Sequence, residues 1–264
     1  MRNGPAVARR LLTKEQMVDL LKQVQKKGWI KSLRPLNAGG IGNTIDALLG
    51  LPETNLPIAD TAQWELKSHR LGSSSLLTLF HMEPEPKAAR VVVNLLLPNY
   101  GWPSVGWPGE LSFRQTIRVT QATDRGFGIS VVRQAERVIV YFDPSKVDPR
   151  HVDWLDSVNQ RIGLGPLHPQ PYWPFPELFL KASTKLLNAF YIEADTKRER
   201  GEEYFRMKGM LILQNFDIDR FVLAIEQGDV LVDFDARTGH NHGTKFRVRQ
   251  DKIPSLYRYS QAVL

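Results

Sequence analysis

The order of apolar and polar residues divides most of the chain into helices and strands. Apolar residues at helical spacing, with capping residues at several ends, predict helices over 13–27, 44–49, 151–162, 175–187 and 217–227. Alternating or β-branched runs predict strands over 64–68, 75–82, 90–97, 127–133, 138–142, 188–197, 204–213, 229–237 and 244–250. Residues 98–110, rich in Gly, Pro and Trp, are expected to form a loop, and 163–176 a linker or lobe boundary. This mixture indicates an α/β fold.

The predicted strand 64–68 carries a candidate catalytic site. Glu65 and Lys67 are two residues apart, so a strand places them on one face, and 75–82 is a candidate pairing partner. Asp60 lies close enough in sequence to bring a second carboxylate to the same place. Two carboxylates can hold Mg²⁺, with Mn²⁺ as a substitute, and such a metal lowers the pKa of bound water. A neighbouring lysine can orient that water. Alternatively, Glu65 and Lys67 form a solvated pair on an edge strand.

A glycine-rich segment precedes the short helix predicted over 44–49. Asn43 or Thr44 is expected to cap this helix, and free N–H groups at its start can hold a DNA phosphate. Asp46 then either joins the metal site as a third acid or only favours the helix dipole.

Two alternating strands near the C-terminus form a candidate recognition hairpin. One polar face collects Asp235, Arg237, Lys245 and Arg247, and the loop between the strands carries His240 and His242. Arginine can bind guanine O6 and N7 together, and aspartate can accept from cytosine N4, so Asp235 and Arg237 can read a C·G pair. Lys245 and Arg247 are readers or phosphate contacts. A zinc site at the histidines is disfavoured because no thiolate or third histidine stands nearby. The alternative is a hydrated sheet face without a ligand.

The runs G-N-T-I-D-A-L-L-G, D-x4-E-L-K-S and D-F-D-A-R-T-G-H-N-H-G-T-K-F-R together resemble the MvaI/BcnI family of type II restriction endonucleases. This family is related to the MutH nicking enzyme within the PD-(D/E)xK superfamily. The resemblance extends from about Thr13 to Arg258, and it departs at Ala59, where the superfamily name has proline.

The resemblance implies a mixed β-sheet flanked by helices, with two lobes that form a cleft for double-stranded DNA. Residues 1–162 would form the catalytic lobe and 163–264 the recognition lobe. It further implies a monomer that cleaves short CC-N-GG-like sites with Mg²⁺. The readers that it carries over are Asp235, Arg237, His240, His242 and Arg258.

Composition agrees with a polyanionic partner. The 264 residues carry a formal charge of +7, a sequence pI of about 9.6 and no cysteine, which excludes disulfides and thiolate metal sites. No apolar run is long enough to span a bilayer, so we expect a cytoplasmic protein without a membrane partner.

Two alternatives to a restriction enzyme stay open. One is a MutH-like strand-nicking repair endonuclease, and the other is a catalytically idle DNA-binding module. The sequence also leaves open whether a DNA methyltransferase accompanies the enzyme.

Overall fold

The computed structural model describes residues 12–35, 37, 39–51 and 64–263. It forms two compact units built from interleaved segments. The first unit comprises Met1–Ser75, Ser183–Phe216 and Tyr257–Leu264, and the second comprises Leu76–Ala182 and Asp217–Leu256. These units do not follow the single division after residue 162 that the sequence suggested. The catalytic and recognition roles given to the two lobes stay predictions.

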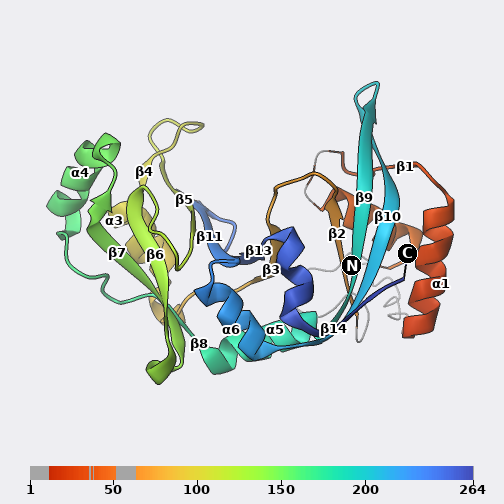
Figure 1. Ribbon diagram of the computed structural model, residues 1–264. Coiled ribbons are helices and arrows are strands. Elements are labelled where there is room, and N and C mark those ends of the chain that lie inside the picture. The colour runs from red at the N-terminus through yellow and green to blue at the C-terminus, as the bar shows by residue number, and fades with distance from the viewer. Residues whose placement is uncertain (1–11, 36, 38, 52–63, 264) are drawn as a thin grey trace, which may run out of the picture. The chain divides into compact units, whose positions relative to one another are not determined.

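The first unit is built on a five-stranded mixed sheet (Figure 1). Its order is β1 (Ile30–Lys31), β10 (Glu202–Phe216), β9 (Asn188–Glu199) and β2 (Glu65–Arg70), and β14 (Tyr257–Ala262) also pairs with β10. Strands β2 and β9 run parallel, whereas the other pairs are antiparallel. Helices α1 (Lys14–Lys26) and α2 (Gly40–Leu48) contribute to the same apolar core as the sheet.

Helix α1 shows how closely the local sequence specifies this unit. Thr13 and Gln16 form a capping box, in which each side chain accepts a hydrogen bond from the other residue's backbone N–H. Apolar side chains at helical spacing are buried against the sheet, namely Met17, Leu21 and Val24. Gly28, with a φ of 70°, follows the helix end, as a glycine can at little cost. The predicted helix is confirmed.

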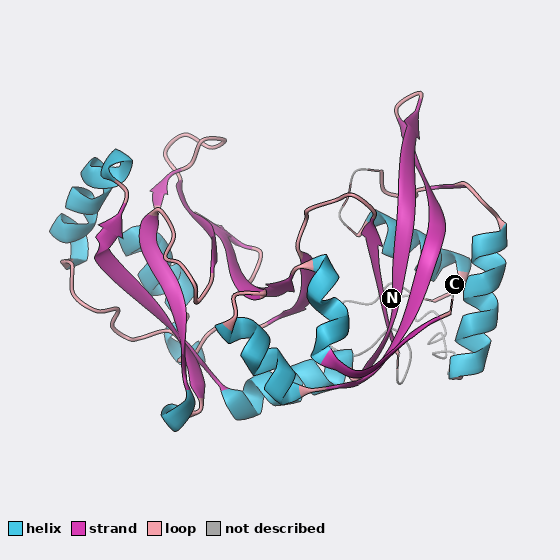
Figure 2. Ribbon diagram, viewed as in Figure 1, coloured by secondary structure: helices cyan, strands magenta, loops and turns pink. Residues whose placement is uncertain are grey.

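The second unit contains two sheets (Figure 2). The six-stranded sheet has the order β3 (Leu77–His81), β13 (Lys245–Val248), β11 (Val230–Arg237), β5 (Leu111–Ile117) and β4 (Trp102–Pro103), with β12 (His240–Asn241) paired to β11. The three-stranded sheet consists of β6 (Arg125–Val132), β7 (Arg137–Val147) and β8 (Tyr172–Pro174). The longer helices are α4 (Val152–Ile162), α5 (Phe175–Leu186) and α6 (Ile218–Glu226). Residues of α5 from Ser183 onward group with the first unit.

Short helical turns complete the second unit. They are η1 (Lys87–Ala89), η2 (Val92–Leu96), α3 (Leu97–Tyr100), η3 (Arg133–Ala135), η4 (Pro149–His151) and η5 (Gln250–Leu256). The predicted hairpin turn near Ala135 is confirmed, with η3 joining β6 and β7. Asp217 caps α6 as expected, because its side chain accepts from the N–H groups of Asp219 and Arg220.

Aromatic side chains form much of the core beneath the six-stranded sheet. Phe113 and Phe234 meet edge to face with ring centroids 5.5 Å apart, and Phe246 stacks on Phe80 at 5.0 Å. The predicted alternation in β11 is confirmed: Val230, Val232 and Phe234 are buried, while Asp233, Asp235 and Arg237 are partly exposed. The core therefore fixes which side chains the sheet presents on its polar face.

The predicted strand over 90–97 is wrong, because this segment is helical. The π-helix η2 leads directly into α3. Two buried pairs, Val91 with Val92 and Leu95 with Leu96, recur at four-residue spacing, and Asn94 between them is exposed. A short apolar run fits a buried helix as well as a buried strand, and here the helical spacing prevails over β-branching.

Two further predictions need correction. Strand β3 pairs with β13 in the second unit, whereas the segment 64–68 pairs with β9 in the first. Helix α2 begins at Gly40 rather than after Asn43, with Gly39 at its N-cap and no capping side chain. Thr44 lies inside the helix, where its hydroxyl donates to Gly40 O at 2.7 Å. The first turn of the helix was not predicted because it is rich in glycine and has no capping side chain.

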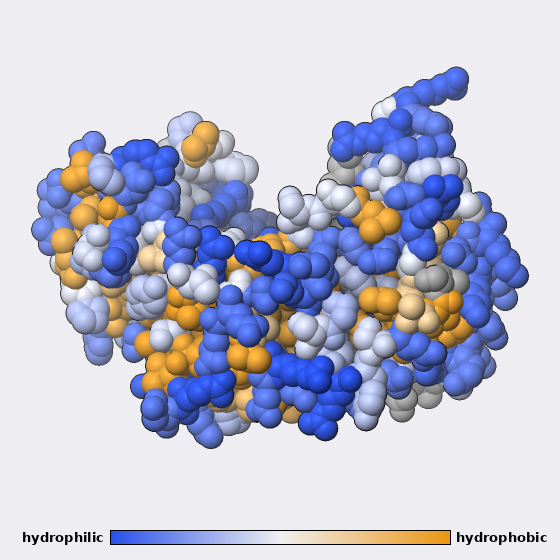
Figure 3. Space-filling view, in the orientation of Figure 1, coloured by the Kyte–Doolittle hydropathy of each residue, from blue (hydrophilic) through white to orange (hydrophobic). Residues whose placement is uncertain are grey.

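The tip of the β9–β10 hairpin is charged and solvated, as expected. Glu199, Arg200 and Gly201 are exposed, and Figure 3 shows the tip as a hydrophilic projection. No helix within the described ranges is both long and apolar enough to cross a membrane.

Candidate functional site

The first candidate site lies on β2. Glu65 is only 3% exposed, and Lys67 Nζ lies 2.6 Å from Glu65 Oε1. The two-residue spacing therefore brings the side chains together as predicted. The alternative of a solvated surface pair does not fit a carboxylate this deeply buried.

A second lysine reaches the same carboxylate. Lys185, in the last turn of α5, places its Nζ 3.6 Å from Glu65 Oε1. Both ammonium groups thus contact one oxygen of Glu65. The other oxygen, Oε2, is buried and accepts no hydrogen bond from the part of the chain that the structure describes. Such an orphaned oxygen is costly unless another group binds it.

Tyr257 and His69, both in the first unit, have pKa values shifted by burial and by a nearby carboxylate. Burial, with the negative charge of Glu65, raises the pKa of Tyr257 far above its usual value. His69, on the same strand as Glu65, stacks on Tyr191 with ring centroids 4.9 Å apart. Burial lowers the pKa of His69, although the charge of Glu193 opposes this shift. His69 is therefore neutral at pH 7.

The remaining residues predicted for this site are Asp60, which the structure does not describe, and Asn43, Thr44 and Asp46 on α2. Asp60 lies outside the described residues, so its expected position beside Glu65 stays a prediction. Asp46 lies on α2, which packs against β2. Thr44 is buried, and besides its bond to Gly40 its hydroxyl accepts from Leu33 N at 3.0 Å. This placement gives Thr44 a part in fixing the helix. The expected DNA contact of Asn43 stays a prediction, whereas that of Thr44 does not fit a side chain 2% exposed whose hydroxyl already serves two backbone groups.

The second candidate site is a charged face on the six-stranded sheet, formed by Arg114, Asp233, Asp235, Arg237, Lys245 and Arg247. Asp235 lies between two cations: Arg114 Nε is 2.9 Å from Oδ1 and Lys245 Nζ is 2.8 Å from Oδ2. Burial alone would raise the pKa of Asp235, but the hydrogen bond from Lys245 and the nearby positive charges together lower it. Asp235 is thus held as a carboxylate.

The neighbouring acid on β11 is also matched. Asp233 accepts from Thr116 Oγ1 at 2.9 Å and from Arg247 Nη1 at 3.3 Å. Arg247 in turn donates to Leu76 O at 2.7 Å. The polar side chains of β5, β11 and β13 therefore form a connected row of hydrogen bonds across three strands.

Arg237 is held by the loop before β5. Its Nη1 donates to Glu110 Oε2 at 2.6 Å, and its guanidinium carbon lies 4.2 Å from the ring centroid of Trp107. The side chains of Arg237 and Glu110 are 21% and 29% exposed, so solvent reaches both. The loop that the sequence predicted from its Gly, Pro and Trp content thus supports one of the predicted readers.

The loop after β11 exposes its two histidines. The rings of His240 and His242 meet edge to face with centroids 4.2 Å apart. Glu83 anchors the loop, because its carboxylate accepts from the backbone N–H and hydroxyl of Thr244. Among the described residues no group of three or more acids and histidines is placed to hold a metal ion. Arg258 lies on β14 in the first unit and is not part of this face.

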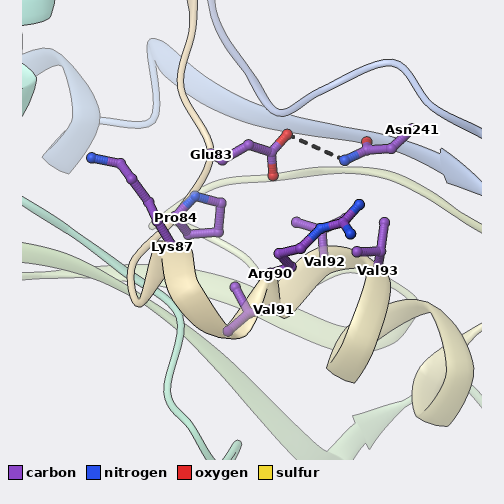
Figure 4. Close-up of a pocket in the computed structure, with 8 residues that line it drawn as sticks. All are labelled: Glu83, Pro84, Lys87, Arg90, Val91, Val92, Val93 and Asn241. Atoms are coloured by element: carbon purple, nitrogen blue, oxygen red, sulfur yellow. Dashed lines mark hydrogen bonds between the residues drawn. The ribbon is translucent and has the colours of Figure 1, made fainter.

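A pocket of about 280 Å³ lies beside the anchored loop (Figure 4). Arg90 lines it together with Glu83 and Asn241, and also lines a neighbouring hollow of about 470 Å³ next to Arg237 and His240. Lys87 is neutralised by Glu85 and Glu177. Within the described ranges, by contrast, the guanidinium of Arg90 forms no ion pair. Arg90 is thus an uncompensated cation at the edge of the charged face.

Sequence reasoning missed several members of both sites, chiefly Lys185, Glu110 and Arg114. Arg114 had a local signal, since Phe113 and Ile117 are apolar while Ser112, Arg114 and Thr116 alternate with them along β5. Lys185 and Glu110 had no such signal, because their partners lie more than 100 residues away in sequence.

Comparisons with known proteins agree with this fold. The chain matches the MvaI/BcnI restriction endonuclease family over residues 18–257. It is similar to a solved structure described as a complex of restriction endonuclease MvaI with cognate DNA, with 23% identity and a TM-score of 0.77 over 96% of this chain and 100% of that one. The structure of MvaI without DNA gives 22% identity and a TM-score of 0.53 over 97% and 100%. No curated protein sequence matches.

The solved structures confirm the fold that the sequence motifs implied. The family match covers most of the chain, including both candidate sites, and it confirms the expected class of activity, sequence-specific restriction of DNA. This chain belongs to the MvaI/BcnI restriction endonuclease family.

Proposed function

We propose that the enzyme hydrolyses phosphodiester bonds of double-stranded DNA at a short CC-N-GG-like site, using Mg²⁺, for which Mn²⁺ can substitute. The observation that carries this proposal is the state of Glu65. One carboxylate oxygen is held by two ammonium groups, and the other is buried without a hydrogen-bond partner in the described part of the chain. Carboxylate oxygen is the ligand that Mg²⁺ prefers, so the donor chemistry fits.

Asp60 and Glu65 would hold the metal, and Asp46 would assist from α2. A bound divalent ion polarises the phosphoryl group and lowers the pKa of water. Lys67, whose ammonium contacts Glu65, orients the attacking water and offsets the negative charge that develops on the phosphate. Lys185 keeps part of the charge of Glu65 compensated, so Lys67 can turn towards the water without leaving that carboxylate unpaired.

For recognition, we propose that Asp235 accepts from cytosine N4 and that Arg237 donates to guanine O6 and N7. Further readers are His240, His242 and Arg258, and the phosphate contacts are Lys245, Arg247, Asn43 and Arg90. These last contacts fix the position of the duplex without reading its sequence. The similarity to MvaI bound to its cognate DNA supports a duplex as the substrate.

Digestion of a sequenced plasmid with Mg²⁺, followed by mapping of the new ends, tests this proposal. We expect both strands to be cut at one short site without any helper protein. Cutting of a single strand only would favour the MutH-like alternative. Specific binding in Ca²⁺ without cleavage in Mg²⁺ or Mn²⁺ would favour an idle DNA-binding module. We also propose a monomer, to be tested by sedimentation of the free enzyme and of its complex with a cognate duplex.

A further inference from the structure

The loop Ser104–Glu110 reaches a predicted reader of DNA from outside the recognition hairpin. Its backbone is closed by two hydrogen bonds, from Ser104 N to Glu110 O at 2.9 Å and from Glu110 N to Trp107 O at 3.1 Å. Just beyond it, Leu111 N donates to Thr238 Oγ1 at 2.9 Å, and Thr238 N donates to Leu111 O at 3.0 Å. Glu110 is therefore fixed next to the end of β11.

This support leaves one side of the Arg237 guanidinium available. Glu110 engages Nη1, and Trp107 covers the plane of the group. Neither Nε nor Nη2 hydrogen-bonds to any residue in the described ranges. Those two nitrogens form the side of the fork that can donate two parallel hydrogen bonds to guanine O6 and N7.

We infer that Glu110 and Trp107 are positioning residues for Arg237, which preset its guanidinium for one guanine. The inference rests on the proposed role of Arg237 as a base reader. A long arginine side chain loses much rotamer freedom when it is fixed. Glu110 and Trp107 impose that loss before DNA arrives, so more of the contact energy appears as discrimination between bases.

An opposite reading of the same contact makes a different prediction. If Glu110 competed with DNA for Arg237, its removal would raise affinity for every duplex. A positioning role instead predicts that discrimination falls at a single base pair. The two readings therefore differ in the sign of the change for cognate DNA.

The test is competition binding in Ca²⁺ between the mapped cognate duplex and duplexes that each carry one changed base pair. A bidentate contact of this kind discriminates by about 5- to 150-fold, which Arg237→Ala should abolish at one position. Glu110→Ala should lose part of that discrimination at the same position, more than about twofold but less than Arg237→Ala loses, and should lower the cognate affinity. Glu110→Gln, which keeps an acceptor oxygen, should fall between Glu110→Ala and the wild type.

Matched controls exist for both positioning residues. Glu226 pairs with Arg133 by two hydrogen bonds of 2.7 and 2.6 Å elsewhere in the second unit, so Glu226→Ala removes a similar pair. Trp29 lies 4.8 Å from the guanidinium carbon of Arg206, so Trp29→Ala is the control for Trp107→Ala. Neither control should change discrimination at the Arg237 position, whereas Trp107→Ala should reduce it.

Two failures are distinguishable. Unchanged discrimination in Arg237→Ala would refute the proposed reader. A normal loss in Arg237→Ala, combined with unchanged discrimination or a higher cognate affinity in Glu110→Ala, would overturn only the positioning inference. Thermal unfolding of each variant identifies any uniform loss caused by misfolding, and discrimination ratios within one variant are independent of its active fraction.

Discussion

Replacement of Lys67 by alanine separates the chemistry of the candidate active site from its stability. The change removes the ammonium 2.6 Å from Glu65 Oε1, while Lys185 stays 3.6 Å from the same oxygen. Coulomb energy falls as the inverse of distance, so at equal dielectric Lys185 attracts Glu65 with 2.6/3.6, or about 0.7, of the energy of Lys67. Glu65 therefore remains partly compensated in the variant.

The stability cost follows from this arrangement. Loss of one charge-assisted hydrogen bond should lower the free energy of unfolding by about 1.5–3 kcal/mol. The double variant Lys67→Ala/Lys185→Ala leaves the buried carboxylate without a cation, and its cost should reach about 3–5 kcal/mol. Urea unfolding of both variants measures the difference.

The catalytic cost should be much larger for Lys67 than for Lys185. Removal of a positioned group that stabilises a transition state lowers the rate by about 10²- to 10³-fold. We expect that loss for Lys67→Ala in single-turnover plasmid cleavage with Mg²⁺, with specific binding in Ca²⁺ retained. Lys185→Ala should lose less than about tenfold, because Lys67 remains. Near wild-type cleavage by Lys67→Ala, or equal losses in the two variants, would refute the assigned role of Lys67.

Three further predictions address recognition and stability. Arg237→Ala should weaken discrimination at one base pair by about 1–3 kcal/mol, measured by competition binding, whereas uniform weakening would indicate a phosphate contact. Arg90→Ala should weaken binding of all duplexes alike and reduce the magnitude of the slope of log K against log salt concentration by about 1. The control is Lys146→Ala, whose side chain is exposed on β7, and it should leave that slope unchanged. Burial lowers the pKa of His69, so below pH 6.5 the imidazole binds a proton in the unfolded chain but not in the folded one. The free energy of unfolding should therefore decrease as the pH is lowered. His69→Gln should reduce that fall in thermal unfolding between pH 6.5 and 5, and an unchanged pH dependence would contradict the shift.

Local patterns predicted the elements whose burial follows their own periodicity. Helix α1 and strand β11 bury the side chains that their spacing indicated. The strand prediction for the segment from Val91 to Leu96 was wrong because, in this short apolar run, β-branched residues favour a strand and the four-residue spacing favours a helix. Its packing in the fold decided between them, and that packing is not encoded in the segment alone.

The sites were predictable to the extent that their residues are neighbours in sequence. Glu65 and Lys67 lie two positions apart on one strand, so the period of the strand brings them together. Lys185 reaches Glu65 because α5 leads into β9, which pairs in parallel with β2. That pairing joins residues more than 100 positions apart, and no local sequence pattern predicts which strands pair at that distance.

The charged face and the neighbouring Glu110 together hold three acids and four matched cations before DNA binds. Asp233 pairs with Arg247, Asp235 with Arg114 and Lys245, and Glu110 with Arg237. These pairs cancel much of the attraction that the cations alone would exert on any phosphate backbone. In the proposed recognition, Asp235 would exchange its contacts with Arg114 and Lys245 for a cognate base edge, whereas Arg237 would keep Glu110 and bind the base through Nε and Nη2. A wrong base offers no equivalent replacement, so the exchange favours specificity over affinity. Lys245 and Arg247, as proposed phosphate contacts, would then fix the register of the duplex more than they attract it, and attraction at longer range would come from uncompensated cations such as Arg90.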